Sequence, residues 1–341
     1  MQSFFKKLPR YSLRLLLAYL VYIFTGGVLA YLLPRQARNL PQTDSFYGIG
    51  RGPDRAVLVE EPQDAFARRV EVIRTAQSTL DVCYHCVKSG ETTECFFAEL
   101  LRAADRGVRV RVLLDGTVGG LSGARSNIAL ALRAHPNIEY RIYNLVDLLR
   151  PWEWNALLHD KFILADDRML LLGGRNIGDE YFAPPGYEGA VTYDRDVLVL
   201  NDLAGTPDSS ESVTAQAKIY MDTLWDAPET DKFGTLSPSR RADGLAAQEY
   251  LKETAARWEA AAPSFYLPSE PASQCAVPTQ RVTLLHNPVS PFKKEPALGA
   301  TLAQLLSGCQ KIRLQTPYAT ANPSTLAALT RLAKQGHVEY L

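Results

Sequence analysis

The strongest chemical pattern in the sequence is a histidine, a lysine and an aspartate with the spacing H-x-K-x4-D. It comprises His159, Lys161 and Asp166 in the segment LHDKFILADDRMLLLGGRN (158–176). Residues two apart on a strand face the same side, so the imidazole and the ammonium are expected to point together. A neutral imidazole can attack phosphorus, and a fixed ammonium can neutralise the anionic phosphodiester. The pattern therefore predicts phosphodiester chemistry.

The residues around this pattern predict a β-hairpin that would build the site. Strands are expected at 158–164 and 169–173, joined by a turn at 165–168 that contains two aspartates. A turn centred between these aspartates would place Gly174 roughly opposite His159. A residue without a side chain there would leave room for a phosphate group.

Substrate-binding groups are also expected around the hairpin. Asn176 can donate its amide to a phosphoryl oxygen, and Lys161, Gly173 and Gly174 complete the expected binding set. One histidine cannot be both the attacking group and the proton donor in a single step. A second acid–base group is therefore required.

Other residues of chemical interest have simpler interpretations. Cys83 and Cys86 flank His85, but residues three apart on a strand face opposite sides, and no second pair with zinc spacing follows. Neither a metal nor a cofactor is expected. Trp152 and Trp154 precede the pattern and form either an apolar wall near lipid chains or ordinary packing.

An alternation of strands and helices precedes the pattern. Strands are expected at 56–59, 80–87 and 108–114, and helices at 64–77 and 92–105, the second closed by a left-handed Gly107. Strands separated by helices of this length are typical of an α/β fold with a mostly parallel sheet and right-handed crossovers.

A second copy of this alternation is expected near the C-terminus. Arg281–Leu285 resembles the first strand, Leu298–Leu306 the first helix, and Lys311–Leu341 parallels Thr79–Leu113. Two similar halves are therefore expected, each unable to complete the site alone.

The second copy reaches Leu341 without a second H-x-K-x4-D pattern. The repeat offset predicts that pattern roughly eighty residues or more beyond Ile312, in a longer protein. If the chain ends at Leu341, activity would need a homodimer that brings together two copies of His159. A half-site that serves as a binding module is the non-enzymatic alternative.

An apolar run near the N-terminus predicts a membrane anchor. The 19 residues from Leu15 to Leu33 carry no charge and would span roughly 28 Å as a helix. Four basic residues precede the run, which places the N-terminus in the cytoplasm and the remaining chain on the outer face of the cell membrane. A signal peptide cleaved after Ala30 is the alternative.

Composition limits the function classes. The 341 residues include 37 basic and 37 acidic residues and are 46% apolar, as in an ordinary globular protein. Zero net charge gives no support for a nucleic-acid-binding surface. The odd count of five cysteines excludes a complete disulfide framework within one chain.

These observations divide the chain into five expected parts. They are a tail and anchor at 1–34, a linker at 35–54, a first half at 55–226, an inter-domain linker with a helix at 227–280, and the start of a second half at 281–341. The expected helix covers 245–261, with Leu251, Ala255 and Trp258 on one side.

The motifs together resemble those of the phospholipase D superfamily, and most closely those of bacterial C-type cardiolipin synthases. The pattern continues as H-x-K-x4-D-x6-G-[SG]-x-N, and the resemblance covers about Arg55 to the end. The similar segments are GGRNIGDEYF (173–182), RAADRGVRVRVLLD (102–115), HPNIEYRIYN (135–144) and QTPY (315–318).

The resemblance implies a mixed sheet flanked by helices and a phosphohistidine formed on His159. Lys161 and Asn176 would hold the non-bridging oxygens, whereas Asp166 would have a structural role. A downstream carboxylate usually orients the nucleophile; Asp194 is the first candidate, with Asp196 next, and a strand-edge charge is the alternative for both.

The resemblance also implies a function. A cardiolipin synthase-type phosphatidyltransferase would act on a phosphatidylglycerol-like phospholipid in the bilayer. Hydrolysis, as by a phospholipase D or a nuclease, is the enzymatic alternative, and the neutral charge disfavours the nuclease.

Overall fold

The computed structural model describes residues 2–32, 35–290, 292, 294–309, 311–314, 323–334 and 338–340. The chain divides into two compact units. One comprises 49–283; the other comprises 1–48 together with 284–341. The hairpin lies in the first unit, which is described first.

A nine-stranded mixed sheet forms the centre of the unit 49–283. Its strand order is β8-β4-β3-β2-β5-β6-β7-β1-β9. The strands are β1 (Asp54–Val59), β2 (Thr79–Tyr84), β3 (Arg109–Asp115), β4 (Ile138–Tyr143), β5 (Lys161–Ala165), β6 (Met169–Gly173), β7 (Asp196–Asn201), β8 (Thr230–Lys232) and β9 (Val277–Pro278).

Only the middle of this sheet is parallel. Strands β2, β3 and β4 pair in parallel, whereas β5, β6, β7 and β1 pair antiparallel in succession after β2. The expected mixed sheet flanked by helices is confirmed. The expectation of a mostly parallel sheet is wrong for β1, because the chain returns through the β5–β6 hairpin and β7 before it pairs with that strand.

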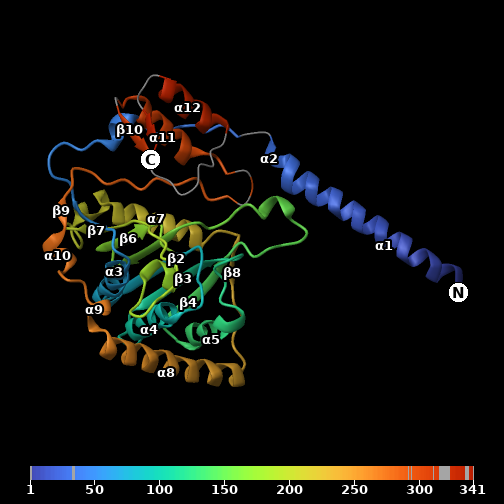
Figure 1. Ribbon diagram of the computed structural model, residues 1–341, viewed down its shortest axis with the longest axis horizontal. Helices are drawn as coiled ribbons and strands as arrows, with labels where there is room; N and C mark the ends of the chain where they lie inside the picture. The colour runs from blue at the N-terminus through green and yellow to red at the C-terminus, as the bar shows by residue number, and fades with distance from the viewer. Residues whose placement is uncertain are drawn as a thin grey trace. The chain divides into compact units, whose positions relative to one another are not determined.

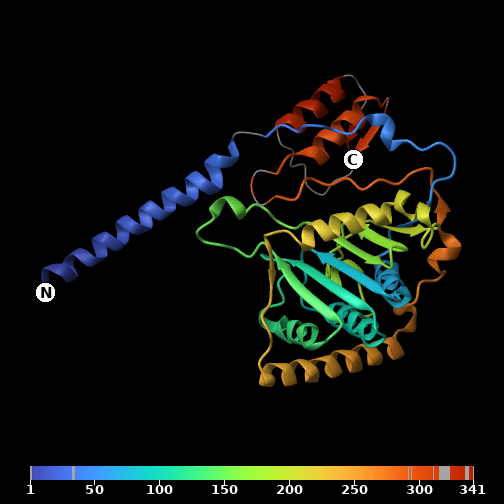
Figure 2. The same cartoon turned by 180° about the vertical axis from the view of Figure 1, so that it is seen from behind.

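Helices cover both faces of the sheet. On one face α3 (Pro62–Thr75), α4 (Glu91–Asp105) and α5 (Ser126–Ala134) pack on the strands, and α7 (Val213–Trp225) covers the other face. The long helix α8 (Pro238–Ala261) lies outside α4 and α5 as a further layer (Figures 1 and 2).

The amphipathic pattern of the sequence explains why these helices bury the faces they do. Phe66, Val70 and Ile73 of α3 are fully buried, as the helical spacing predicts. On α4, Phe96, Phe97 and Leu100 are buried as well. Gly107, with φ +96°, follows α4 in the left-handed conformation expected for a helix C-terminus.

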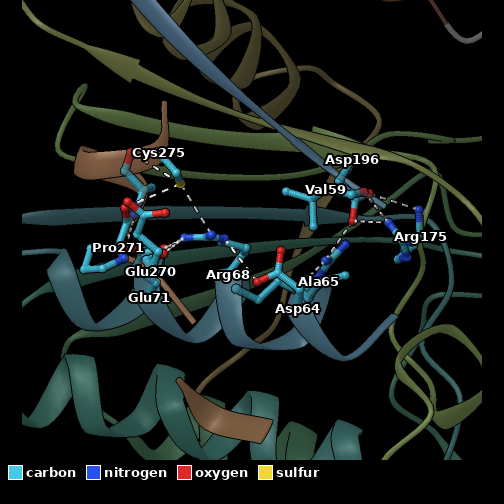
Figure 3. A network of polar contacts seen from close by, with 12 residues as sticks. Val59, Asp64, Ala65, Arg68, Glu71, Arg175, Asp196, Glu270, Pro271 and Cys275 are labelled. Atoms are coloured by element: carbon cyan, nitrogen blue, oxygen red, sulfur yellow. Dashed lines mark hydrogen bonds and ion pairs between the residues drawn. The ribbon is translucent and has the colours of Figure 1, made fainter. Parts of the chain in front are cut away.

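The segment 227–280 contributes several elements to the same unit. It includes β8, α8 and β9, and Leu251 and Ala255 of α8 are buried against the core. Arg68 of α3 holds the end of this segment: it donates to the Glu270 carbonyl at 2.8 Å and pairs with Glu71 (Figure 3).

The unit formed by 1–48 and 284–341 contains the N-terminal helix α1 (Gln2–Ile23). It continues as a π-helix (Phe24–Leu29) and α2 (Ala30–Leu32). Within it, Tyr11–Leu29 is long and apolar enough to cross a membrane, with a mean hydropathy of 1.7. None of this stretch is buried in the structure.

The C-terminal part of this unit contains a second β-α-β arrangement. Strand β10 (Ile312–Leu314) pairs in parallel with β11 (Val338–Tyr340), and α11 (Ala297–Ser307) and α12 (Pro323–Lys334) accompany them. The expected helix at 298–306 is confirmed. The strand expected at Arg281–Leu285 is wrong, because these residues adopt no regular structure. The QTPY segment 315–318 lies outside the described residues.

Candidate active site

The predicted hairpin is present, with a register that differs by one residue. Strands β5 and β6 pair from Phe162 opposite Leu172 to Ala165 opposite Met169. The turn therefore spans three residues and is centred on Asp167 instead of between Asp166 and Asp167. Continued along this register, His159 would lie opposite Arg175, so Gly174 is offset by one residue from the position expected for it.

Asp166 anchors the turn end of the hairpin. Its carboxylate accepts backbone N–H groups from Gln77, Ser78 and Thr79 at 2.5, 2.8 and 2.7 Å. These residues lead into β2, so the bonds join the hairpin turn to the neighbouring strand. This arrangement fits the structural role expected for Asp166.

His159 and Lys161 lie together at the opposite end of the hairpin. The Lys161 ammonium lies 3.5 Å from Nδ1 of His159 and donates to the His159 carbonyl at 2.8 Å. Asp160, between them, faces the other way and accepts from the Tyr220 hydroxyl at 3.0 Å. The strand alternation thus brings imidazole and ammonium to one face, as predicted.

The surroundings favour a neutral imidazole. His159 is solvent-exposed, whereas only 6% of Lys161 is exposed. Partial burial, the Lys161 cation and His85 together lower the pKa of His159 to about 4. Burial lowers the pKa of Lys161, although Asp160 and Asp194 oppose this effect. At neutral pH His159 is therefore uncharged and has a lone pair available for attack.

Two residues that the sequence did not single out hold His159 in place. The His85 ring lies 4.5 Å from the His159 ring, and its Nδ1 lies 2.8 Å from the Leu158 carbonyl. Because a carbonyl only accepts, this nitrogen carries the hydrogen. Asp115 accepts the Leu158 N–H at 2.9 Å.

A signal for both residues was present in the sequence. His85 directly follows β2 and Asp115 ends β3, and these strands pair in parallel. Polar residues at the carboxyl ends of adjacent parallel strands meet at one edge of the sheet, where ligands commonly bind. Through its contact with the Leu158 carbonyl, His85 helps to position the segment that carries His159.

The two glycines after β6 make room for carboxylates of the next segment. A Cβ on Gly173 would overlap the Asp196 carboxylate, and a Cβ on Gly174 would overlap that of Asp194. The Asp194 carboxylate accepts the Arg195 N–H at 2.8 Å. No contact between Asp194 and His159 occurs among the described contacts, so the orienting role of Asp194 stays a prediction.

Asp196 belongs to a buried ion cluster. Its carboxylate lies 2.9 Å from Arg69 and 3.1 Å from Arg175, and all three side chains are at most 2% exposed. Figure 3 shows Asp196 beside Arg175. Burial raises the pKa of Asp196, but the two guanidiniums outweigh this effect and the net pKa is lowered. Its contacts make Asp196 a structural residue that holds β7 against α3.

Asn176, just after β6, links this part of the chain to the segment that follows β2. Its Oδ1 accepts the Cys86 N–H at 3.0 Å, and its amide donates to the Tyr181 hydroxyl at 3.1 Å. The amide carries two hydrogens, so one can still be donated to a substrate. Asp179, slightly further on, accepts the Thr92 N–H at 2.9 Å and caps α4.

The described residues contain no group of three or more histidine, cysteine or acidic side chains that could hold a metal ion. Cys83 is fully buried, and burial raises the pKa of its thiol; Cys86 is partly exposed. The site therefore consists of an imidazole, an ammonium and amide donors.

Comparison with known proteins agrees with this reading of the residues. Residues 70–199 match the family described as cardiolipin synthase, PLD-like domain. The matched range includes the hairpin, Asn176 and Asp194. Over this range the chain is similar to phospholipase D-like domains.

Two relatives are similar to part of the chain. Cardiolipin synthase C of Escherichia coli (strain K12) is 38% identical over 152 residues, which is 42% of this chain and 31% of that enzyme. An uncharacterized protein of Helicobacter pylori (strain ATCC 700392 / 26695) is 38% identical over 138 residues, or 37% of this chain and 27% of that protein. The chain thus matches less than a third of the length of either relative.

A solved structure resembles a larger part of the fold. The crystal structure of phosphatidylserine synthase from Haemophilus influenzae Rd KW20 aligns with a TM-score of 0.55 and 16% identity. The alignment covers 89% of this chain and 63% of that protein. At this identity the likeness concerns the fold alone.

Proposed function

Because residues 70–199 are similar to the phospholipase D-like domain of cardiolipin synthases, we propose that the chain transfers phosphatidyl groups between phospholipids. The observation that carries the proposal is the pair of His159 and Lys161. An exposed imidazole with a pKa of about 4 lies beside a buried ammonium. A neutral nucleophile next to a desolvated cation is suited to attack on an anionic phosphodiester.

In the first proposed step, a ring nitrogen of His159 attacks the phosphorus of a donor phospholipid. The N–P bond forms as the P–O bond to the headgroup alcohol breaks, and the electron pair leaves with that oxygen. Lys161 and an amide hydrogen of Asn176 stabilise the charge on the non-bridging oxygens. The product is a phosphohistidine and a departing alkoxide that needs a proton.

That proton comes from a second acid, because His159 uses its lone pair on phosphorus. We propose a second H-x-K-x4-D pattern as its source, in a longer protein or in a second copy of this chain. In the second step an acceptor hydroxyl attacks phosphorus, the P–N bond breaks, and the conjugate base of that acid takes the hydroxyl proton. An acceptor lipid gives a cardiolipin-type product, whereas water gives hydrolysis.

The N-terminal helix supports a lipid substrate. A span over Tyr11–Leu29 would confine the site to the vicinity of a bilayer, where phospholipids are concentrated. The basic residues before it place the N-terminus in the cytoplasm and the catalytic domain on the outer face. The topology and the phosphatidylglycerol-like donor are part of the same proposal.

The test is incubation of membranes containing the full chain with radiolabelled phosphatidylglycerol. We expect a labelled cardiolipin-type lipid and an acid-labile label on the protein, both absent from His159→Ala. His286→Ala serves as a matched control, because this histidine lies in the other unit. Phosphatidic acid in place of the transfer product would indicate hydrolysis, and a product pattern unaffected by His159→Ala would overturn the proposal.

A further inference from the structure

A groove of about 830 Å³ opens beside the His159 site. Its walls come from the glycine-rich loop 116–123 after β3, from α5, from the end of β4 and from the start of α8. All of these elements belong to the unit 49–283. The groove is therefore part of the same compact body as the hairpin.

The groove is lined by cations and by no carboxylate. Lys88, Arg125, Arg133 and Arg240 are among its lining residues, which include neither aspartate nor glutamate. Lys88 pairs with Glu180. Within the described part of the chain, the three arginines form no ion pair. An uncompensated cluster of this kind is a site for an anion.

Two of these arginines, Arg133 and Arg240, lie close enough to repel each other. The Arg133 guanidinium lies 4.7 Å from the centre of the Phe233 ring and donates to the Gly234 carbonyl at 2.8 Å. Burial and the neighbouring Arg240 lower the pKa of Arg133. A bound anion would relieve this repulsion, and its contribution to affinity would be correspondingly large.

The groove borders residues that contact the site of the proposed transfer. Cys86 lines the groove, follows His85 in the chain, and donates its N–H to Asn176. The loop packs tightly here, since a Cβ on Gly119 would lie 2.7 Å from the His85 carbonyl oxygen. A molecule in the groove would thus lie next to the residues that position His159.

The remaining lining is apolar. Val118, Leu121, Ile142 and Leu145 contribute to the wall, and Val118 and Leu145 are 44% and 46% exposed. Cations beside an apolar wall match an amphiphile with an anionic headgroup better than they match a nucleic acid, whose bound surface is polar. This chemistry is that of an anionic phospholipid.

We propose that this groove binds the acceptor phospholipid through its phosphodiester, which is held by Arg125, Arg133 and Arg240. The proposal rests on the proposed function. The donor phosphate must lie at Lys161 for His159 to reach phosphorus, so a separate set of cations serves a second anion. The acceptor's own phosphodiester stays intact while its headgroup hydroxyl forms the new O–P bond and the P–N bond to His159 breaks.

The first test measures binding without turnover. The full-length His159→Ala chain in uncharged detergent is titrated with dihexanoyl phosphatidylglycerol by calorimetry. Removing two charge-assisted contacts with Arg125→Gln/Arg133→Gln should weaken binding about tenfold or more, and Arg240→Gln about threefold. Arg109→Gln, at the opposite end of β3, is the control and should bind within about twofold of the parent.

Each outcome decides the proposal. Equal affinities for the groove and control variants, at equal thermal stability, would overturn it. Preferential binding of a single-stranded oligonucleotide would replace the lipid by a nucleic acid and also overturn it. In the chain that retains His159, Arg240→Gln should raise the KM for the acceptor lipid, and this result would support the proposal. The titration measures lipid binding and does not depend on transfer. If His159→Ala leaves the product pattern unchanged, the proposed function fails, and the titration still reports whether the groove binds the lipid.

Discussion

Two charged clusters of the unit 49–283 are built on opposite principles. In the cluster of Asp196, Arg69 and Arg175, all three side chains are buried and the carboxylate pairs with both guanidiniums. In the cluster of His159 and Lys161, the ammonium is buried and forms hydrogen bonds with the carbonyl and a ring nitrogen of one histidine.

The difference in pairing distinguishes charges that stabilise the fold from a charge that is available to bind a substrate. Buried charges that are fully paired hold elements together and are costly to break. A buried cation with only neutral hydrogen-bond partners costs stability in the absence of a ligand, but it is ready for an anion. The two aspartates downstream of the hairpin illustrate this division, because Asp196 joins the paired cluster and Asp194 does not.

The largest effect is expected when the paired cluster is broken. Asp196→Ala leaves two buried guanidiniums unpaired and should lower the free energy of unfolding by about 3–5 kcal/mol, measured by urea denaturation. Because the folded-state pKa of Asp196 is lowered, this contribution is complete above the unfolded pKa and is lost as the pH falls through the folded pKa. Asp194→Ala is the matched control, expected within about 0.5 kcal/mol of the parent; equal losses for both would refute the comparison.

Lys161→Met should lower the rate of lipid transfer without lowering the stability of the fold. It removes the cation that stabilises the transition state and should lower the rate of lipid transfer about 10²- to 10³-fold. The free energy of unfolding should stay the same or rise, because a buried charge is replaced by an apolar chain of similar length. Rate measurements combined with urea denaturation check both parts, and a strongly destabilised but active variant would contradict them.

Asp166→Ala should affect stability alone. It removes an acceptor of three backbone N–H groups and should lower the free energy of unfolding by about 2–3 kcal/mol. Asp167→Ala is the control for backbone strain, since both residues have a positive φ, 51° and 54°. Transfer by Asp166→Ala well below its melting temperature should match the parent; a specific loss of rate would assign Asp166 to the chemistry.

The smallest effect concerns pH. With a His159 pKa of about 4, kcat/KM should be independent of the protonation of His159 at neutral pH and fall about tenfold per pH unit below that value. Lys161→Met removes a nearby cation and should raise the His159 pKa. An NMR titration of the His159 ring protons, assigned with His159→Ala, would measure both values. A pKa near 6.5 in the parent would contradict the proposed neutralising environment.

Much of the site was predictable because it is local in sequence. The H-x-K-x4-D spacing, the strand alternation and the turn residues all act within a few residues, so His159 and Lys161 were correctly expected on one face. The hairpin register was missed by one residue, because it depends on how β6 also pairs with β7. His85 and Asp115 were missed because their role depends on neighbours along the sheet edge.

The amino-acid sequence by itself determined the chemical groups, the helix faces and the apolar N-terminal run, because each follows from residue type and short-range periodicity. Only the tertiary structure decided which charges are paired. Asp194 and Asp196 are two residues apart and chemically identical, yet one meets two guanidiniums from distant segments and the other does not. The arginine-lined groove likewise depends on tertiary structure, because it forms only where the loop after β3, α5 and the start of α8 come together.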